Sequence, residues 1–166
     1  MLRGARLLGL FLLCLLVLEA AWMAARPTQF NRWLIDEATV GTSTALINLL
    51  TPKVAASAHE SSIVASGGGI NVRSGCEGTE VLLPLIAALL ASPISWRMRL
   101  FAGLTGTALV FALNQLRLLA LFYSFRIDPV LFGRIHGFVG PLLLDLGVLV
   151  FFQAVLRRNG IGRRWA

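Results

Sequence analysis

Three residues of this chain have side chains whose combination could do covalent chemistry: Cys76, Arg117 and His136. A thiolate is a strong nucleophile, a guanidinium stabilises developing negative charge, and an imidazole gives or accepts a proton near neutral pH. The three residues lie far apart in the sequence, so the fold must bring them together before they can act as one site.

Cys76 lies between Ser74 and Glu77, which have the spacing of a helix capping box. We therefore expect a helix that begins near Ser74 and carries Cys76 in its first turn, where the partial positive charge of the helix N-terminus favours the thiolate. The carboxylates of Glu77 and Glu80 oppose that effect, so a reactive thiol would also need a cationic partner. A buried structural thiol is the alternative for Cys76, and it is the role we expect for Cys14.

Arg117 lies inside an apolar run, about five residues before its end, and Asn114 shares its face of the predicted helix. An arginine at the centre of a bilayer costs at least about 2.5–3.5 kcal/mol, although its side chain can snorkel outward from a shallower depth. The pairing with Asn114 favours a polar face that is turned into a helix bundle. Glu19 and Asp145 lie at a similar depth, and we expect either of them to pair with Arg117.

His136 precedes the last apolar run and is predicted to lie in a loop on the same side of the membrane as Cys76 and Arg117. A loop histidine usually has no special role, and the shared depth of the three residues is the reason to consider it as an acid or base. The two histidines and two cysteines do not have the spacing of metal ligands, so we predict neither a metal site nor a cofactor.

The composition indicates a membrane protein, because 57% of the residues are hydrophobic and only 14% are charged. Four apolar stretches predict four transmembrane helices in a single membrane domain of residues 1–166, at about 7–25, 76–95, 100–122 and 138–156. The basic residues before the first stretch also suit a signal peptide, but the stretch is long for one, and we expect an uncleaved anchor.

The basic residues predict the orientation of these helices. One set of helix ends carries eight arginines and no acidic residue, whereas the other set carries six basic and six acidic residues. Positive charge stays in the cytoplasm, so both termini are expected there, with loops 26–75 and 123–137 outside. Because the basic residues flank apolar runs instead of forming a patch on a polar domain, we expect the lipid bilayer as a partner and no nucleic acid.

The long outer loop, residues 26–75, has structural patterns of its own. Apolar residues recur at helical spacing between Phe30 and Leu50, which predicts an amphipathic helix on the outer membrane surface that Pro52 ends. Two short apolar runs, 63–65 and 70–72, flank a glycine-rich turn and predict a β-hairpin just before the second transmembrane helix.

Four short motifs follow one another along the chain: Ser66-Gly67-Gly68-Gly69-Ile70-Asn71-Val72, Gly75-Cys76-Glu77-Gly78, Asn114-Gln115-Leu116-Arg117, and His136. In order, spacing and expected depth they resemble the exosortase/archaeosortase family, and are most similar to its small single-core members such as exosortase H. The resemblance covers roughly residues 60 to 156.

The resemblance implies a protein-sorting cysteine transpeptidase or protease of the bacterial inner membrane. The expected substrates are exported proteins with a C-terminal tail made of a short motif, a membrane helix and a basic cluster; the resemblance leaves the acyl acceptor open. Cys76 would be the nucleophile, Arg117 the electrostatic stabiliser and His136 the acid or base. The supporting residues would be Asn114, Glu77 and Gly78.

Two other functional classes are compatible with a small membrane protein of this kind. A non-catalytic scaffold or assembly protein would not need the Cys76 thiol. A transporter or channel subunit would need polar residues through the whole membrane depth, whereas the cytoplasmic halves of the predicted helices are apolar apart from Thr105 and Thr107.

Overall fold

A computed structural model describes residues 2–72 and 76–160 of the protein, and most of them are helical. The helical elements are α1 (Leu2–Ala25), α2 (Gln29–Trp33), the π-helical segment η1 (Leu34–Gly41), α3 (Thr42–Leu50), the 3₁₀ turn η2 (Pro52–Val54), α4 (Thr79–Ala91), α5 (Trp96–Ile127), α6 (Pro129–Arg134), the π-helical segment η3 (Ile135–Val139) and α7 (Gly140–Arg158). Three short strands precede α4: β1 (Ser57–His59), β2 (Ser62–Val64) and β3 (Ile70–Asn71).

Three of the described helical segments are long and apolar enough to cross a membrane: Gly4–Ala25, Trp96–Ile127 and Pro129–Arg158. This result is consistent with the all-α membrane protein that the composition predicts. The second predicted span corresponds to α4, which has only 13 residues. The helix ends at Ala91, because Ser92 precedes Pro93 and a residue before proline avoids the helical conformation.

The beginning of α4 differs from the prediction. Gly78 has φ 86°, a left-handed conformation that glycine adopts easily, and the helix starts only after it, at Thr79. The predicted capping box, with Cys76 in the first helical turn, is therefore wrong, because Cys76 precedes the helix. Ser74, the other half of the predicted box, lies outside the described residues.

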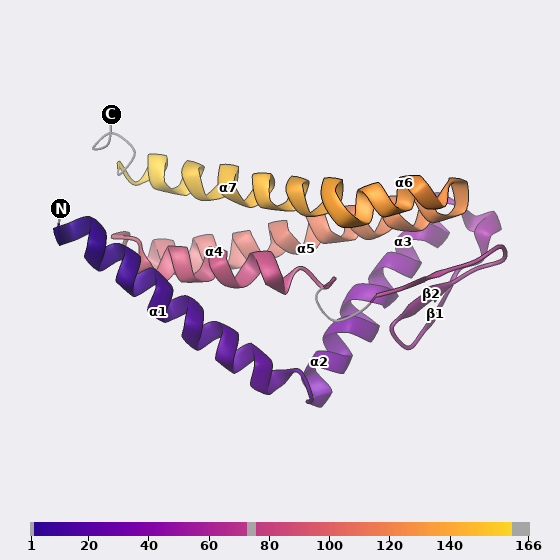
Figure 1. The fold of residues 1–166 in the computed structure, drawn as a ribbon, viewed down its shortest axis with the longest axis horizontal. Coiled ribbons are helices and arrows are strands. Elements are labelled where there is room, and N and C mark those ends of the chain that lie inside the picture. The colour runs from indigo at the N-terminus through magenta and orange to yellow at the C-terminus, as the bar shows by residue number, and fades with distance from the viewer. Residues whose placement is uncertain (1, 73–75, 161–166) are drawn as a thin grey trace.

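The long helices pack with α4 at the centre (Figure 1). Helices α4, α5 and α7 contact one another, whereas α1 packs against α4 and diverges from α7. We call the end of the bundle where α1 ends, α4 begins and α5 passes into α6 the sheet end, because the strands lie there. The start of α1 and the end of α7 lie toward the opposite end (Figure 1).

The connection between the last two predicted elements is helical. Helix α6, the segment η3 and α7 follow one another without a break from Pro129 to Arg158. Asp128 caps this long helix, because its carboxylate oxygen accepts a hydrogen bond from the backbone N–H of Val130 at 2.8 Å. The prediction of a loop at His136 is therefore wrong, since His136 lies in the π-helical turn η3. Such turns break the regular helical ladder locally and are frequent at functional sites.

The segment between α1 and α4 forms a helical arm and a small sheet. The predicted helix is confirmed as α2, η1 and α3, and residues of its predicted apolar face, such as Phe30 and Leu49, are exposed. Its position on the outer membrane surface stays a prediction. The predicted hairpin is confirmed as β2 and β3, paired antiparallel, and β1 adds a third strand that the sequence pattern did not predict.

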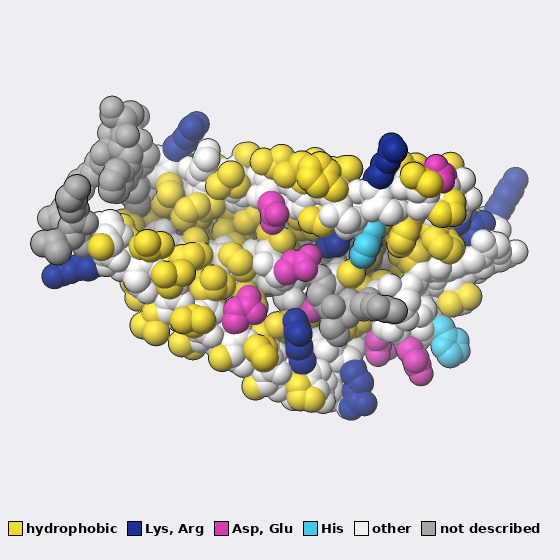
Figure 2. All heavy atoms as spheres, viewed as in Figure 1, with side chains coloured by type: hydrophobic (Ala, Val, Ile, Leu, Met, Phe, Trp, Pro, Cys, Tyr) yellow, Lys and Arg dark blue, Asp and Glu magenta, His cyan; other side chains and the backbone are white. Residues whose placement is uncertain are grey.

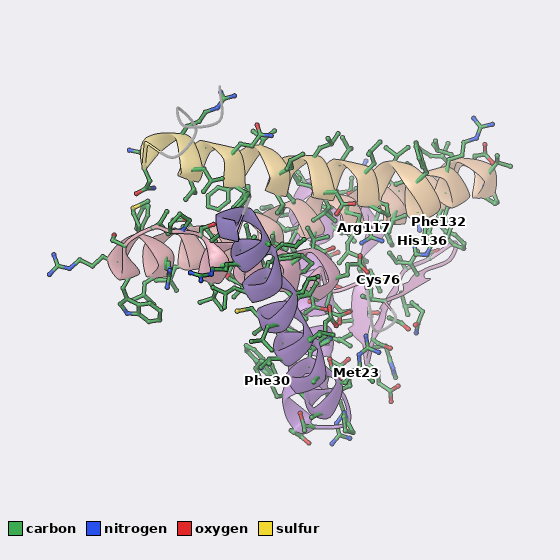
Figure 3. The ribbon with its side chains drawn as sticks, turned by 60° about the vertical axis from the view of Figure 1, so that its left-hand side comes forward. Met23, Phe30, Cys76, Arg117, Phe132 and His136 are labelled. Carbon is green, nitrogen blue, oxygen red and sulfur yellow. The ribbon has the colours of Figure 1, made fainter. Side chains whose placement is uncertain are left out.

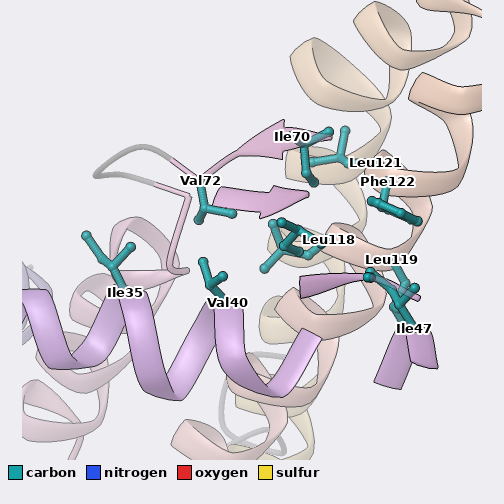
Figure 4. Close-up of a cluster of buried hydrophobic side chains, with 11 residues drawn as sticks. Ile35, Val40, Ile47, Ile70, Val72, Leu118, Leu119, Leu121 and Phe122 are labelled. Atoms are coloured by element: carbon teal, nitrogen blue, oxygen red, sulfur yellow. The ribbon is translucent and has the colours of Figure 1, made fainter. Parts of the chain in front are cut away.

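The described residues form two hydrophobic clusters. The cluster at the sheet end joins the arm, the sheet and α5 (Figure 4), and its buried residues include Ile35, Val40, Ile47, Ile70, Val72, Leu118, Leu119, Leu121 and Phe122. The second cluster lies between α4, α5 and α7. Cys76, Phe132 and Ile135 are partly buried against the first cluster, so this cluster holds the surroundings of the predicted site.

Candidate functional site

Asn114 connects α5 to the segment that carries Cys76. It is 1% exposed, and its Nδ2 donates a hydrogen bond to the carbonyl oxygen of Cys76 at 2.9 Å. Gly78 makes this approach possible: a Cβ atom at position 78 would lie 3.4 Å from Asn114 and 3.3 Å from Val110, in addition to the strain of its positive φ. The backbone from Cys76 to Gly78 is therefore held closely against α5.

Arg117 lies one turn after Asn114 and is buried, with 6% of its side chain exposed. It therefore does not snorkel, and the prediction that Asn114 and Arg117 face into the bundle is confirmed. The Nη1 atom of Arg117 forms an ion pair with Oε1 of Glu80, in the first turn of α4, at 3.1 Å. The expected partners Glu19 and Asp145 are not paired with Arg117, so that expectation is wrong.

Gly140, the first residue of α7, contacts the other side of the Arg117 side chain. A Cβ atom at position 140 would lie 3.1 Å from both Cγ and Nε of Arg117 and 2.8 Å from the carbonyl oxygen of Ile135. The absence of a side chain thus lets α7 approach the guanidinium. The Nε atom of Arg117 is buried and has no hydrogen-bond partner among the described residues.

His136 lies one turn before Gly140 on the same continuous helix and is exposed. Its ring stacks on that of Phe132, with the centroids 5.7 Å apart and the planes nearly parallel. This stacking limits the rotation of the imidazole. It uses the face of the ring, so the nitrogen atoms at the ring edge are not covered by Phe132. His136 is thus an orientated, exposed imidazole near the helix turn that Arg117 contacts.

Glu77 and Thr79 flank Gly78 and complete the turn before α4. Glu77 is 7% exposed, and its Oε1 accepts a hydrogen bond from the Thr79 hydroxyl at 3.0 Å. This bond satisfies part of a buried carboxylate, as burial of a charged group requires. Glu77 and Gly78, two of the predicted supporting residues, therefore shape the backbone next to the thiol.

The contacts form a continuous path through the three candidate residues. Asn114 bonds the backbone of Cys76, Arg117 follows Asn114 by one turn of α5, and Gly140 joins Arg117 to the helix that carries His136. Figure 3 shows Cys76, Arg117 and His136 in one region, away from Met23 and Phe30 at the junction of α1 and α2. These contacts connect the backbone of Cys76, a buried cation and the helix that carries an exposed imidazole.

Two residues of this arrangement were not among the predicted site residues. Glu80 was considered only as a charge that opposes the thiolate, although its position one turn into a helix at the depth of Arg117 was a usable signal. Nothing in the sequence indicates that Gly140 is important. A side chain at position 140 is excluded because α7 passes close to Arg117 of α5, which the sequence does not show.

A scan against protein-family models and searches of the curated proteins and of the solved structures found no match.

Proposed function

We propose that this protein is a membrane-embedded cysteine transpeptidase or protease that cleaves the C-terminal sorting tail of exported proteins. One observation carries the proposal: a buried arginine lies between the helix whose preceding turn carries Cys76 and the helix that carries His136. Burying a guanidinium in an apolar bundle is costly, and its ion pair with Glu80 offsets only part of that cost. The motifs that resemble the exosortase/archaeosortase family support the same assignment.

In the first step the Cys76 thiolate attacks the scissile carbonyl carbon of the substrate. A C–S bond forms, the carbonyl π electrons move onto oxygen, and a tetrahedral intermediate results. Collapse of this intermediate restores the carbonyl, breaks the C–N bond and leaves a thioester on Cys76. The imidazolium of His136 protonates the departing amine.

Arg117 stabilises the negative charge that develops on the substrate oxygen. Its Nη1 pairs with Glu80, which holds the cation in place. Its buried Nε donates no hydrogen bond to any described residue, so not every N–H group of the guanidinium is occupied. A fixed cation in poorly hydrated surroundings stabilises a transition state because it needs no reorganisation during the reaction. In the second step an acceptor, water or an amine or hydroxyl compound, gives its proton to His136 and attacks the thioester carbonyl. The new acyl bond forms, the C–S bond breaks and the Cys76 thiolate leaves.

The proposal includes a topology in the bacterial inner membrane. The N-terminal helix, α4, α5 and the helix from Pro129 to Arg158 cross the bilayer, both termini lie in the cytoplasm, and the sheet end faces outward. The arginine-rich helix ends at the opposite side support this orientation. A substrate whose own membrane helix stops at the outer interface would then present the preceding motif at the depth of Cys76.

The test co-expresses the full-length protein with an exported reporter domain that ends in a tail-bearing sequence, and follows reporter cleavage on gels. Cleavage is expected with the wild-type protein and with Cys14→Ala, the matched control at the other thiol, but not with Cys76→Ala. Hydroxylamine added to the wild-type reaction should attack the thioester and release the reporter as a hydroxamate of defined mass. Full activity of Cys76→Ala would overturn the catalytic proposal and favour the scaffold alternative.

A further inference from the structure

A groove of about 270 Å³ lies between α1, α4 and α7. Its lining is mostly apolar and includes Phe11 from α1, Ala88 from α4 and Leu149 from α7. Two charged residues also line it, Glu80 in the first turn of α4 and Asp145 in α7. The groove is therefore mostly apolar, with two carboxylates in its wall.

Asp145 leaves the groove with one unbalanced negative charge. Glu80 pairs with Arg117, but 45% of its side chain is still exposed. Asp145 is exposed and forms no hydrogen bond or ion pair with any residue between 2 and 72 or 76 and 160. Figure 2 shows acidic side chains among apolar ones over α1, α4 and α7. An ionised carboxylate within a candidate membrane span is costly unless a cation approaches it, so the groove is complementary to an apolar ligand with one positive charge.

The length of the groove suits a helix that lies along it with some of its side chains inside. Helix α4 forms its floor, while α1 and α7 form walls that diverge from each other (Figure 1). The lining on α4 extends from Glu80 to Ala88, about 12 Å along the axis, which is two turns of a facing helix. Ala88 on the floor permits close backbone approach, as small residues do where membrane helices pack. Helix α1 has only 6% of its apolar window buried, so much of its surface remains uncovered.

We propose that this groove binds a membrane-spanning helix of a partner polypeptide that carries a lysine or arginine at the depth of Glu80 and Asp145. The inference rests on the proposed function, in which that helix belongs to the tail of the exported substrate. Glu80 follows Cys76 by four residues, so a helix in the groove would lead the chain that precedes it toward the thiol.

The test uses a probe that the protein does not need to cleave: an exported reporter domain followed by a designed Leu/Ala membrane helix and a cytoplasmic arginine cluster. The helix carries a single lysine, or leucine as the matched control, at successive positions in its outer half. A photo-crosslinking residue replaces Leu149 in the groove or, as a control outside it, Leu104 on the exposed face of α5. Crosslinking is measured in intact membranes with the full-length protein.

At one lysine position, crosslinking from Leu149 should exceed that of the leucine probe by about threefold or more, the factor for an average polar contact between membrane helices. Asp145→Asn should remove most of this gain, whereas Glu60→Gln, an exposed carboxylate outside the groove, should not. A charge-reversed pair, Asp145→Lys with a glutamate probe, should restore crosslinking even if the Asn variant folds poorly. Equal crosslinking of lysine and leucine probes, or crosslinks to lipid alone, would overturn the proposal.

This crosslinking measurement tests helix binding in the groove separately from the proposed cleavage activity. If Cys76-dependent cleavage occurs but no helix is captured in the groove, the docking proposal fails and the proposed activity stands. If the lysine helix is captured but no tail is cleaved, the groove is a helix-binding site and the proposed activity fails.

Discussion

Arg117 has two constraints on its side chain that come from different helices. Glu80 holds its Nη1 by an ion pair, and Gly140 contacts its aliphatic part and Nε. A guanidinium fixed on both sides keeps a defined position, which is what preorganised charge stabilisation requires. The residue types of the site could be predicted from the sequence, but this pairing could not.

Replacement of Arg117 by alanine should lower kcat/KM for tail cleavage by roughly 10²–10³-fold, the usual effect of losing one preorganised donor. Arg117→Lys should recover little, because an ammonium cannot reproduce the planar fork that reaches Glu80 and the substrate together. The control is Arg134→Ala, an exposed arginine in α6. Equal amounts of protein in the membrane should be verified by blotting, and normal cleavage by Arg117→Ala would contradict its assigned role.

Gly140 and Gly137 form a matched pair of glycines in one continuous helix. A methyl group at 140 would press on Arg117 and on the Ile135 carbonyl, whereas one at 137 meets nothing within 4 Å. We expect Gly140→Ala to destabilise the protein by about 1–3 kcal/mol through overpacking and to reduce cleavage. Gly137→Ala should leave cleavage unchanged and should not destabilise the protein, because alanine favours a helix more than glycine does. Thermal unfolding in detergent together with reporter cleavage measures the difference, and equal behaviour of the two variants would show that Arg117 does not depend on this contact.

The elements of the fold were predictable to different degrees. Apolar runs identify the long helices because their length and composition are constrained by the membrane, and the glycine-flanked apolar runs identify β2 and β3. Boundaries were less predictable: the left-handed Gly78 delays α4, and the helix through His136 has no sequence signal that distinguishes it from a capped loop. The predicted outer loop 123–137 is helical apart from Asp128 for the same reason.

The hairpin of β2 and β3 is held against the end of α5. Arg126 donates a hydrogen bond from Nη1 to the carbonyl oxygen of Ser66 at 2.6 Å, and Phe125 lies next to Gly68. Because this hairpin leads into the segment that carries Cys76, its packing on α5 limits where that segment can go.

Gly69→Ala should break the hairpin, since a Cβ atom there would overlap the carbonyl oxygen of Ile63 and contact Val64. We expect cleavage by added protease within residues 60–72 to become several times faster and tail processing to fall, because local opening exposes the backbone. Ser66→Ala is the control in the same turn, as Arg126 bonds the backbone of Ser66 and not its hydroxyl. Identical digestion of the two variants would argue against a packed hairpin.

The orientation of the whole molecule is a prediction from charge and can be tested with single cysteines in a Cys14→Ala, Cys76→Ala background. Ser66→Cys, in the hairpin turn, should react with a membrane-impermeant maleimide added to spheroplasts. Trp96→Cys, at the exposed start of α5, should react only after the membrane is permeabilised. The reverse labelling pattern would place the candidate site in the cytoplasm and remove the proposed access of exported substrates.

The 13 residues of α4 have a consequence for access to the candidate site. At 1.5 Å per residue the helix is about 20 Å long, whereas the hydrocarbon layer of a bilayer is about 30 Å thick. The longer helices α1, α5 and α7 surround α4, so under the proposed topology they span the depth that α4 does not reach. The start of α4, which pairs with Arg117 through Glu80, would then lie about ten residues below the end of α5. A soluble acceptor would have to enter from the sheet end to reach a thioester at Cys76.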